Sequence, residues 1–338
     1  MGEIKKKLSG IAALALAIMA FFLFLPSRIL AQEDGELEKI FYYSTGSAGI
    51  RSLRDNAAKI DIFAPQAYVV NSKLRISGGL SREIKDIVAK NDLQVMPLVM
   101  NQGFNQKIMS NLLASEKTQD AVIAYLISEA KKNNYIGWQF DFEHIYYLDR
   151  DRFTNFVKKT GVKFRENNLM LSIAAVARKN DTVNSYYKNW SGAFDYEKIS
   201  REVDFISIMT YDDPNSVGPV ASLFYVEEVL KYLDGKVPDA KLSLGVPLYS
   251  WDWYKTTKRA IGHGAVQAIR KNYVCREDFD QNLGVTWVSY SAKGIKRKTW
   301  YEDEKSFELK FKVARENELR GISAWVLGME DPDIWNKI

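Results

Sequence analysis

Two carboxylates stand two residues apart in an apolar run over residues 137–144. Side chains alternate along a strand, so Gln139, Asp141 and Glu143 would share one face, and the phenylalanines between them would share the other. Burying a pair of carboxylates on an apolar strand is costly. Neighbouring carboxylates also separate their pKa values, which leaves one of them protonated and able to act as a general acid near neutral pH. The run therefore predicts a catalytic pair, with a strand-end ion pair to Lys or Arg as the alternative.

A second polar group ends the apolar run over residues 203–210. Met209 and Tyr211 would share a face there, with Asp212 at the rim. A tyrosine hydroxyl beside the carboxylates could hold a polar group of a substrate, and a core Met and Tyr before a polar loop is the alternative. Trp325 stands inside the last apolar run, where an indole is either core filler or a surface on which a sugar ring stacks.

Three further residues stand near the ends of predicted strands. Asn101 ends the third strand, where a barrel offers site residues, and capping of the next turn is the alternative. Tyr68 belongs to the second strand region and could line the groove. His144 would lie on the opposite face from Glu143, so we interpret it as structural.

The elements that must position these residues alternate along the chain. Apolar runs of β type are separated by helix-period segments such as 118–132 and a segment that begins after a possible N-cap at Ser222. Eight alternations predict an α/β fold, a (β/α)8 TIM barrel, whose active site lies at the carboxyl ends of the strands. A stretch at about 255–300 does not fit the alternation, and we expect it to form a small, partly β insertion after the seventh strand. The strand candidates are Lys39–Ser44, Ile60–Val70, Gln94–Met100, Gly137–Glu143, Leu169–Val176, Val203–Thr210, Lys241–Leu248 and Gly321–Leu327.

The first 31 residues combine a basic start at Lys5–Lys7 with an apolar stretch over 8–25. This pattern predicts a secretory signal, or an uncleaved anchor whose basic end stays in the cytoplasm. Residues 32–38 are interpreted as a linker, and 39–338 as the barrel. Either alternative predicts that the folded part is secreted or extracytoplasmic, and that it meets a membrane only through the N-terminal segment.

Composition excludes several classes of function. The chain has 338 residues, a net charge of +5, one cysteine and two histidines. These counts exclude an internal disulfide framework and a three-histidine metal site. The basic residues form no stripe of the kind that nucleic-acid binding requires. We expect a monomer without a metal or a cofactor.

The motifs together resemble glycoside hydrolase family 18, the chitinase-like barrels. The fourth-strand pattern of that family, Asp-Gly-x-Asp-x-Asp-x-Glu, corresponds to Ile136–Glu143, where the glycine and the final Asp-x-Glu are kept while Ile136 and Gln139 replace two aspartates. The sixth-strand pattern Met-x-Tyr-Asp is present at 209–212, and Trp325 matches the eighth-strand tryptophan. Segments 218–223, 244–249 and 300–303 resemble the bacterial spore-germination and cortex-lytic branch, which commonly has an amide at the position of Gln139.

The resemblance implies a substrate-assisted mechanism. Glu143 would be the general acid, Asp141 would orient the 2-acetamido group of the substrate, and Tyr211 would donate a hydrogen bond to the acetamido oxygen. Gln139, Met209, Asp212, Trp325, Asn101 and Tyr68 would bind substrate. Because an amide at position 139 cannot titrate with Asp141, we expect activity with an altered pH profile.

Three functions are weighed from these residues. The first is a retaining glycosidase acting on β-linked N-acetylglucosamine polymers, namely peptidoglycan, chitin oligomers or an exopolysaccharide. The second is a non-catalytic, lectin-like barrel, because two aspartates of the motif are missing. The third is a barrel hydrolase for substrates without an acetamido group. It ranks lowest, because carboxylates with Cα atoms only about 6.6 Å apart do not flank a bond.

Overall fold

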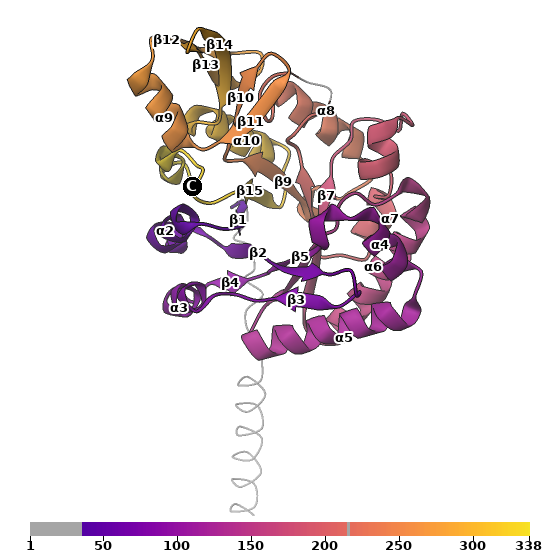
Figure 1. Ribbon diagram of the computed structural model, residues 1–338. Coiled ribbons are helices and arrows are strands. Elements are labelled where there is room, and N and C mark those ends of the chain that lie inside the picture. The colour runs from indigo at the N-terminus through magenta and orange to yellow at the C-terminus, as the bar shows by residue number, and fades with distance from the viewer. Residues whose placement is uncertain (1–35, 215–216) are drawn as a thin grey trace, which may run out of the picture. The chain divides into compact units, whose positions relative to one another are not determined.

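The computed structural model describes residues 36–214 and 217–338 (Figure 1). The predicted signal or anchor segment and most of the predicted linker lie outside the described residues. Among the described residues, no helix is both long and apolar enough to cross a membrane.

Eight parallel strands close into a barrel, as the alternation predicted. β15 pairs with β1, and β1 pairs in turn with β2, which closes the sheet. Each predicted run overlaps one of these strands, so the (β/α)8 fold is confirmed. The strands are β1 (Glu38–Tyr43), β2 (Ile62–Val70), β5 (Leu98–Asn101), β6 (Gly137–Asp141), β7 (Met170–Val176), β8 (Phe205–Met209), β9 (Leu242–Pro247) and β15 (Gly321–Trp325). Two short strands, β3 (Ile76–Gly78) and β4 (Gln94–Val95), pair with β2.

The strands are apolar runs because both of their faces are covered. Every residue of β6 and of β9 is buried. One side packs under helices, as Trp138 and Phe140 do in the main core. The other side faces the barrel interior, where apolar residues such as Tyr42 and Phe205 form a second cluster.

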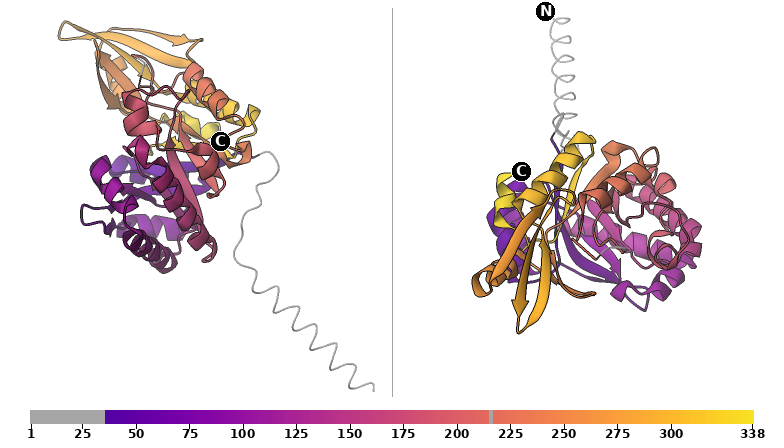
Figure 2. Two further views of the ribbon diagram at one scale, coloured as in Figure 1. Left: turned by 90° about the vertical axis from the view of Figure 1, so that its right-hand side faces the viewer. Right: turned by 90° about the horizontal axis from the view of Figure 1, so that it is seen from above.

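Helices connect the strands and surround them (Figures 1 and 2). Their ends follow local capping chemistry: Ser222 accepts a hydrogen bond from the backbone of Tyr225, and Asp303 forms a capping box with Ser306. The two predicted helical segments correspond to α5 and α8. The helices are α2 (Ser47–Asn56), α3 (Arg82–Asn91), α4 (Gln106–Leu113), α5 (Glu116–Asn133), α6 (Arg150–Arg165), α7 (Tyr196–Ser200), α8 (Leu223–Leu233) and α10 (Glu304–Glu316).

A five-stranded antiparallel sheet forms the insertion after β9, in the order β11-β10-β14-β13-β12. It begins at Ser250, slightly earlier than the expected position of about 255, and Figure 2 shows its strands projecting away from the barrel. Helix α9 packs on one face through Val266 and Ile269. The elements are β10 (Ser250–Tyr254), β11 (Thr257–Ile261), α9 (His263–Asn272), β12 (Cys275–Asp280), β13 (Val285–Ala292) and β14 (Ile295–Tyr301).

Candidate active site

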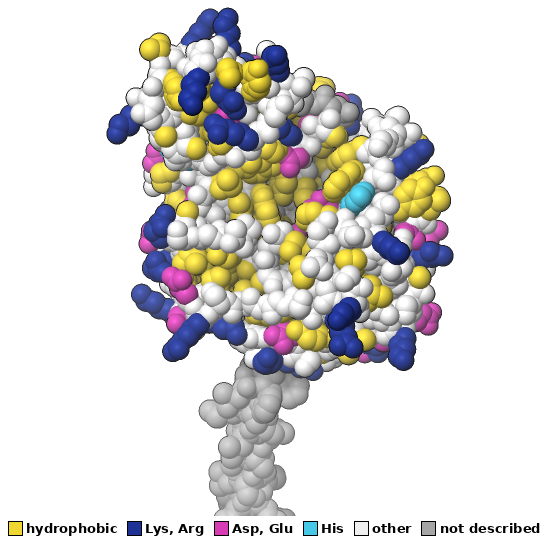
Figure 3. Space-filling model, viewed as in Figure 1, with side chains coloured by type: hydrophobic (Ala, Val, Ile, Leu, Met, Phe, Trp, Pro, Cys, Tyr) yellow, Lys and Arg dark blue, Asp and Glu magenta, His cyan; other side chains and the backbone are white. Residues whose placement is uncertain are grey.

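Asp141 is the last residue of β6 and lies at the carboxyl end of the barrel, the face of which is hollowed in Figure 3. Its side chain is almost fully buried, with 4% relative exposure. Burial raises the pKa of Asp141 to about 7, and a hydrogen bond with the side chain of Gln66 offsets part of this rise. The carboxyl group can therefore gain or lose a proton close to neutral pH.

Glu143 follows two residues later and is half-buried. Burial raises its pKa well above the ordinary value, and the charges of Asp141 and Asp212 raise it further. In the part of the chain that the structure describes, neither Asp141 nor Glu143 has a Lys or Arg nitrogen within 4.0 Å. The alternative of a strand-end ion pair is therefore wrong, and the raised pKa favours the protonated form of Glu143, which is the form that a general acid requires.

Asn101 holds the backbone of Glu143 through two hydrogen bonds. Its Nδ2 donates to the Glu143 carbonyl at 3.0 Å, and its Oδ1 accepts from the Glu143 backbone N–H at 3.1 Å. Nδ2 also donates to the carbonyl of Asn105 at 3.3 Å, and the side chain is only 1% exposed. The assignment of Asn101 to substrate binding is therefore wrong, because its amide is already used to position the residue beside it.

Gln139 lies beneath Asp141 inside the barrel and is fully buried. Its Oε1 accepts from the Tyr42 hydroxyl at 2.7 Å, while its Nε2 donates to Ser172 Oγ at 2.8 Å and to Ser207 Oγ at 3.0 Å. No surface of Gln139 remains for a substrate, so that assignment is also wrong. Its amide forms an uncharged layer under the carboxylates.

The uncharged layer continues across the barrel through serine hydroxyls that the sequence analysis did not single out. Ser207 Oγ lies 2.7 Å from Ser323 Oγ, which lies 2.7 Å from Ser243 Oγ. Each serine interrupts an otherwise apolar strand at an inward position, and this is the signal by which they could have been found. We call Tyr42, Gln139, Ser172, Ser207, Ser243 and Ser323 the interior polar layer.

Tyr211 lies beyond β8 and is half-buried. Burial raises its pKa well above 10, and the charges of Tyr42 and Asp141 add to the rise, so the hydroxyl stays protonated as a donor. A glycine at position 245 makes room for its ring: a Cβ at Gly245 would lie 2.4 Å from the Ile208 carbonyl and 2.9 Å from Tyr211 Cε1. Asp212 is exposed beside it and accepts a hydrogen bond from the Tyr249 hydroxyl at 2.7 Å.

Trp325 and Met209 are both half-buried at the ends of their strands, where a ligand can reach part of each side chain. The indole of Trp325 packs against Tyr42 with a centroid distance of 5.5 Å. Both side chains therefore lie at the carboxyl end of the barrel, on β8 and β15.

Tyr68 does not line the mouth, so its assignment to substrate binding is wrong. It is 1% exposed and packs edge-on against Trp138 in the outer core, with its hydroxyl 3.0 Å from that of Tyr135. A register shift in β2 between Gln66 and Tyr68 breaks the alternation of side chains. As a result, Gln66 rather than Tyr68 reaches Asp141, a position that regular alternation along the strand could not predict.

His144 stacks on Trp190 with a centroid distance of 4.8 Å, and its Nδ1 lies 3.1 Å from the carbonyl of Phe104. These contacts agree with a structural role. Among the described residues, no group of three or more His, Cys, Asp and Glu side chains could hold a metal ion.

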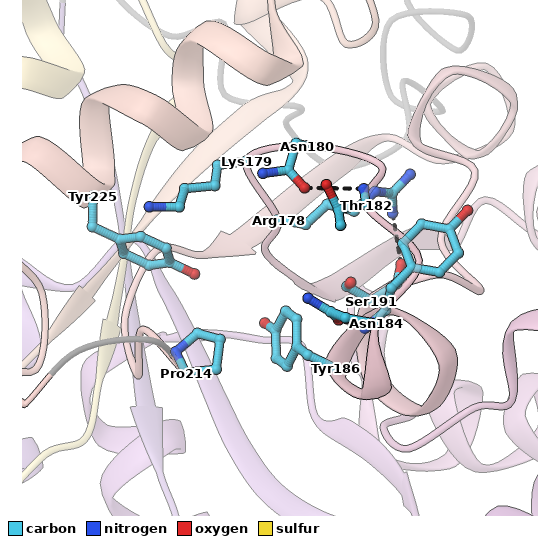
Figure 4. Close-up of a pocket in the computed structure, with 10 residues that line it drawn as sticks. Arg178, Lys179, Asn180, Thr182, Asn184, Tyr186, Ser191, Pro214 and Tyr225 are labelled. Carbon is cyan, nitrogen blue, oxygen red and sulfur yellow. Dashed lines mark hydrogen bonds between the residues drawn. The ribbon is translucent and has the colours of Figure 1, made fainter.

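A pocket of about 140 Å³ follows β7 and extends toward α8 (Figure 4). Its two cations are already paired: Arg178 lies 3.0 Å from Asp181, and Lys179 lies 3.5 Å from Glu228. Tyr186 lines the pocket, and burial raises its pKa well above 10, with a smaller contribution from the charge of Glu143. The pocket is thus lined by polar groups and by two cations that already have carboxylate partners.

Comparison with known proteins agrees with this geometry. The family model described as glycosyl hydrolases family 18 matches residues 9–330. An uncharacterized glycosylase of Bacillus subtilis (strain 168), YvbX, is 25% identical over 309 residues, covering 88% of this chain and 89% of the relative. The cortical fragment-lytic enzyme of the same bacterium is 27% identical over 253 residues, covering 72% of this chain but only 58% of that enzyme.

Solved structures share the fold. The spore cortex-lytic enzyme SleL of Bacillus megaterium QM B1551 aligns with a TM-score of 0.81 and 22% identity, covering 88% of this chain and 72% of the other. A chitinase from Chromobacterium violaceum ATCC 12472 aligns with a TM-score of 0.81 and 24% identity, covering 89% of this chain and 98% of the chitinase.

Proposed function

The chain belongs to glycosyl hydrolases family 18 and is a glycoside hydrolase, and from this premise we propose that it cleaves β-linked N-acetylglucosamine-containing polysaccharide with retention of configuration. The observation that carries the proposal is the half-buried Glu143, whose pKa is raised well above the ordinary value beside the buried Asp141. An acid that stays protonated at neutral pH at the mouth of a barrel is suited to protonate a leaving-group oxygen.

The proposed reaction uses the substrate as its own nucleophile. Glu143 protonates the glycosidic oxygen while the carbonyl oxygen of the 2-acetamido group attacks the anomeric carbon, so that the C–O bond to the leaving sugar breaks. Asp141 orients the acetamido N–H and stabilises the positive charge of the oxazolinium intermediate, and Tyr211 donates a hydrogen bond to the acetamido oxygen. Glu143, now a carboxylate, removes a proton from water, which attacks the anomeric carbon and reopens the ring.

The uncharged Gln139 distinguishes this site from one with an acid in the same position. The Gln139 amide exchanges hydrogen bonds only with hydroxyl groups and cannot titrate, so the carboxyls that share the proton are Asp141 and Glu143, with the charge of Asp212 acting on Glu143. We propose that the pH profile of the activity follows these two carboxyls.

The test is turnover of N-acetylglucosamine oligomers and peptidoglycan fragments by the full chain and by its Glu143→Gln form. Loss of the general acid should lower the rate by on the order of 10²–10⁴. Glu227→Gln, which alters an exposed residue of α8, is the matched control and should leave the rate unchanged. Equal turnover by the Glu143→Gln and unchanged forms would refute the assignment, and binding without product from the unchanged chain would favour the lectin-like alternative.

We also propose that the enzyme acts outside the cytoplasm, because the apolar residues 8–25 follow a basic start. Cell fractionation with an antibody to the barrel would test this, since protein confined to the cytosol contradicts export. Sedimentation of the folded protein would test the expected monomer.

A further inference from the structure

One face of the insertion sheet is covered by α9, and the opposite face carries two rows of side chains. Residues paired across neighbouring strands point to the same side of a sheet. Trp251 pairs with Trp300, which pairs with Trp287, so three indoles form the first row, and the exposed Asp278 pairs with Trp287 at its end. Lys258 pairs with Trp253, and Trp253 pairs with Lys298, which forms the second row. We call the four tryptophans and two lysines the Trp–Lys face.

The Trp–Lys face begins at the active site. Tyr211 meets Tyr249 edge-on at a centroid distance of 6.5 Å, and Tyr249 meets Trp251 edge-on at 5.3 Å. Trp253 Nε1 donates to the Gly218 carbonyl at 2.7 Å, which fastens the face to the loop after β8. A continuous aromatic path therefore leads from the acetamido-binding position proposed above onto the sheet.

The two lysines of this face lie on indole rings instead of on carboxylates. Lys258 Nζ is 3.9 Å from the ring centroid of Trp251, and Lys298 Nζ is 3.8 Å from that of Trp300. Neither ammonium group has a carboxylate oxygen within 4.0 Å among residues 36–214 and 217–338. More distant acids face the two lysines. The charges of Asp212 and Asp213 stabilise the protonated form of Lys258, and the charge of Asp280 stabilises that of Lys298.

Lys298 is half-buried and Lys258 is exposed, and burial lowers the pKa of both without a paired anion to compensate. A cation–π contact offsets only part of this cost. An incoming anion would offset the remaining free-energy cost of burying the lysine cations. The face is therefore a place where an anion binds favourably.

The charge of the whole insertion supports the same ligand. Residues 250–301 contain ten Lys and Arg and four Asp and Glu. Of these acids, Asp252 is paired with Arg259 and Arg297, and Glu277 is paired with Arg270. Figure 3 shows dark blue side chains gathered over the insertion, with hydrophobic side chains between them and the hollow.

We propose that the Trp–Lys face binds the part of a glycan chain that extends beyond the active site, and that it selects chains carrying carboxylates. Lys258 and Lys298 turn from the rings of Trp251 and Trp287 to pair with the carboxylates, and these half-exposed indoles then stack on sugar rings. This inference rests on the proposed function, because it assigns a polymer of amino sugars to the mouth. An amino-sugar chain with acidic side groups, rather than uncharged chitin, is the ligand whose chemistry matches the face.

The spacing of the lysines agrees with a polymer. They lie on either side of β10, two strand spacings apart, which is about 10 Å. That separation is comparable to one disaccharide of a β-1,4-linked chain, so carboxylates on alternate sugars could reach both cations.

The test measures binding by calorimetry with the full chain carrying Glu143→Gln, which prevents turnover. The probe is an N-acetylglucosamine–N-acetylmuramic acid tetrasaccharide with free lactyl carboxylates, and the control ligand is the same tetrasaccharide with those carboxylates converted to methylamides. We expect the free acid to bind roughly tenfold more tightly. Adding Lys258→Met or Lys298→Met, which keeps the aliphatic chain over the indole, should weaken binding of the acid by roughly three- to tenfold each and leave the methylamide unaffected.

Two further variants control for charge and for folding. Lys271→Met removes the same charge from α9, on the opposite face of the sheet, and should change neither affinity. Lys258→Arg and Lys298→Arg retain the charge and should retain most of the affinity for the acid.

The outcomes separate this inference from the proposed function. Equal affinity for the two ligands, failure to bind either, or an equal loss in Lys271→Met would overturn the Trp–Lys face as an anion-selective site, even if the unchanged chain cleaves glycans. Charge-dependent binding by a chain that shows no turnover would uphold the face and overturn the proposed activity.

Discussion

Asp141 retains its proton to a higher pH than an exposed carboxyl because the barrel buries it. Its pKa of about 7 in the folded state exceeds the ordinary value of 3.8, so the folded protein binds more protons than the unfolded chain between these limits. The stability that the neutral carboxyl contributes is therefore fully present below about pH 4 and is lost as the pH rises toward 7.

The decrease in stability with rising pH can be tested by unfolding experiments. The free energy of unfolding of the unchanged protein should fall by roughly 2–4 kcal/mol between pH 4 and pH 8 because Asp141 ionises. Asp141→Asn is neutral at every pH and should not show this fall. Urea unfolding at the two pH values would measure it. Asp86→Asn alters an exposed residue of α3 and should keep the pH dependence of the unchanged protein. An identical pH dependence in Asp141→Asn would contradict the raised pKa.

Asn101 acts on catalysis through the residue that it holds. Asn101→Ala should leave the Glu143 backbone without its two hydrogen bonds, so the general acid loses its position. We expect kcat to fall by roughly 10- to 100-fold with a smaller change in KM. Steady-state kinetics would measure both, with Gln102→Ala at the exposed neighbouring position as the control. A rise in KM alone would instead place Asn101 in contact with substrate.

At the scale of elements, β9 approaches β8 closely because position 245 has no side chain. Gly245→Ala should cost about 1–3 kcal/mol of unfolding free energy and lower activity, because the new methyl group displaces either β8 or the Tyr211 ring. Gly264→Ala in α9 meets no atom within 4 Å and should be neutral or slightly stabilising. Thermal unfolding and activity of the two variants test this, and equal effects would contradict the close approach.

The strands also show how much of the fold and the site could be predicted from the sequence. Eight nearly continuous apolar runs predicted the barrel, and the positions of Asp141, Glu143 and Tyr211 followed from strand parity. Parity fails where the backbone is irregular: the register shift in β2 moves Gln66 to the site and Tyr68 to the outer core. The roles of Asn101 and Gln139 depend on partners from distant segments, which one strand cannot reveal.

At the scale of the whole molecule, positive charge is concentrated on the insertion, while the active-site mouth carries the acidic residues Asp141, Glu143 and Asp212. Salt screens interactions between exposed charges. We expect kcat/KM for the carboxylated tetrasaccharide to fall several-fold between about 50 and 500 mM NaCl, and kcat/KM for neutral chitin oligomers to stay nearly constant. Parallel kinetics on the two substrates would test this, and the same salt dependence for both would contradict selection by charge.

The interior polar layer ties together six of the eight barrel strands, since its members come from β1, β6, β7, β8, β9 and β15. It excludes β2 and β5. Hydrogen–deuterium exchange should therefore respond unevenly to Gln139→Leu: opening of β1 and β6 becomes easier by at least roughly tenfold, because hydroxyls lose a buried partner, while β2 and β5 change less. The rigidity of the barrel directly beneath the bound sugar would then depend on the uncharged hydrogen bonds of the interior polar layer.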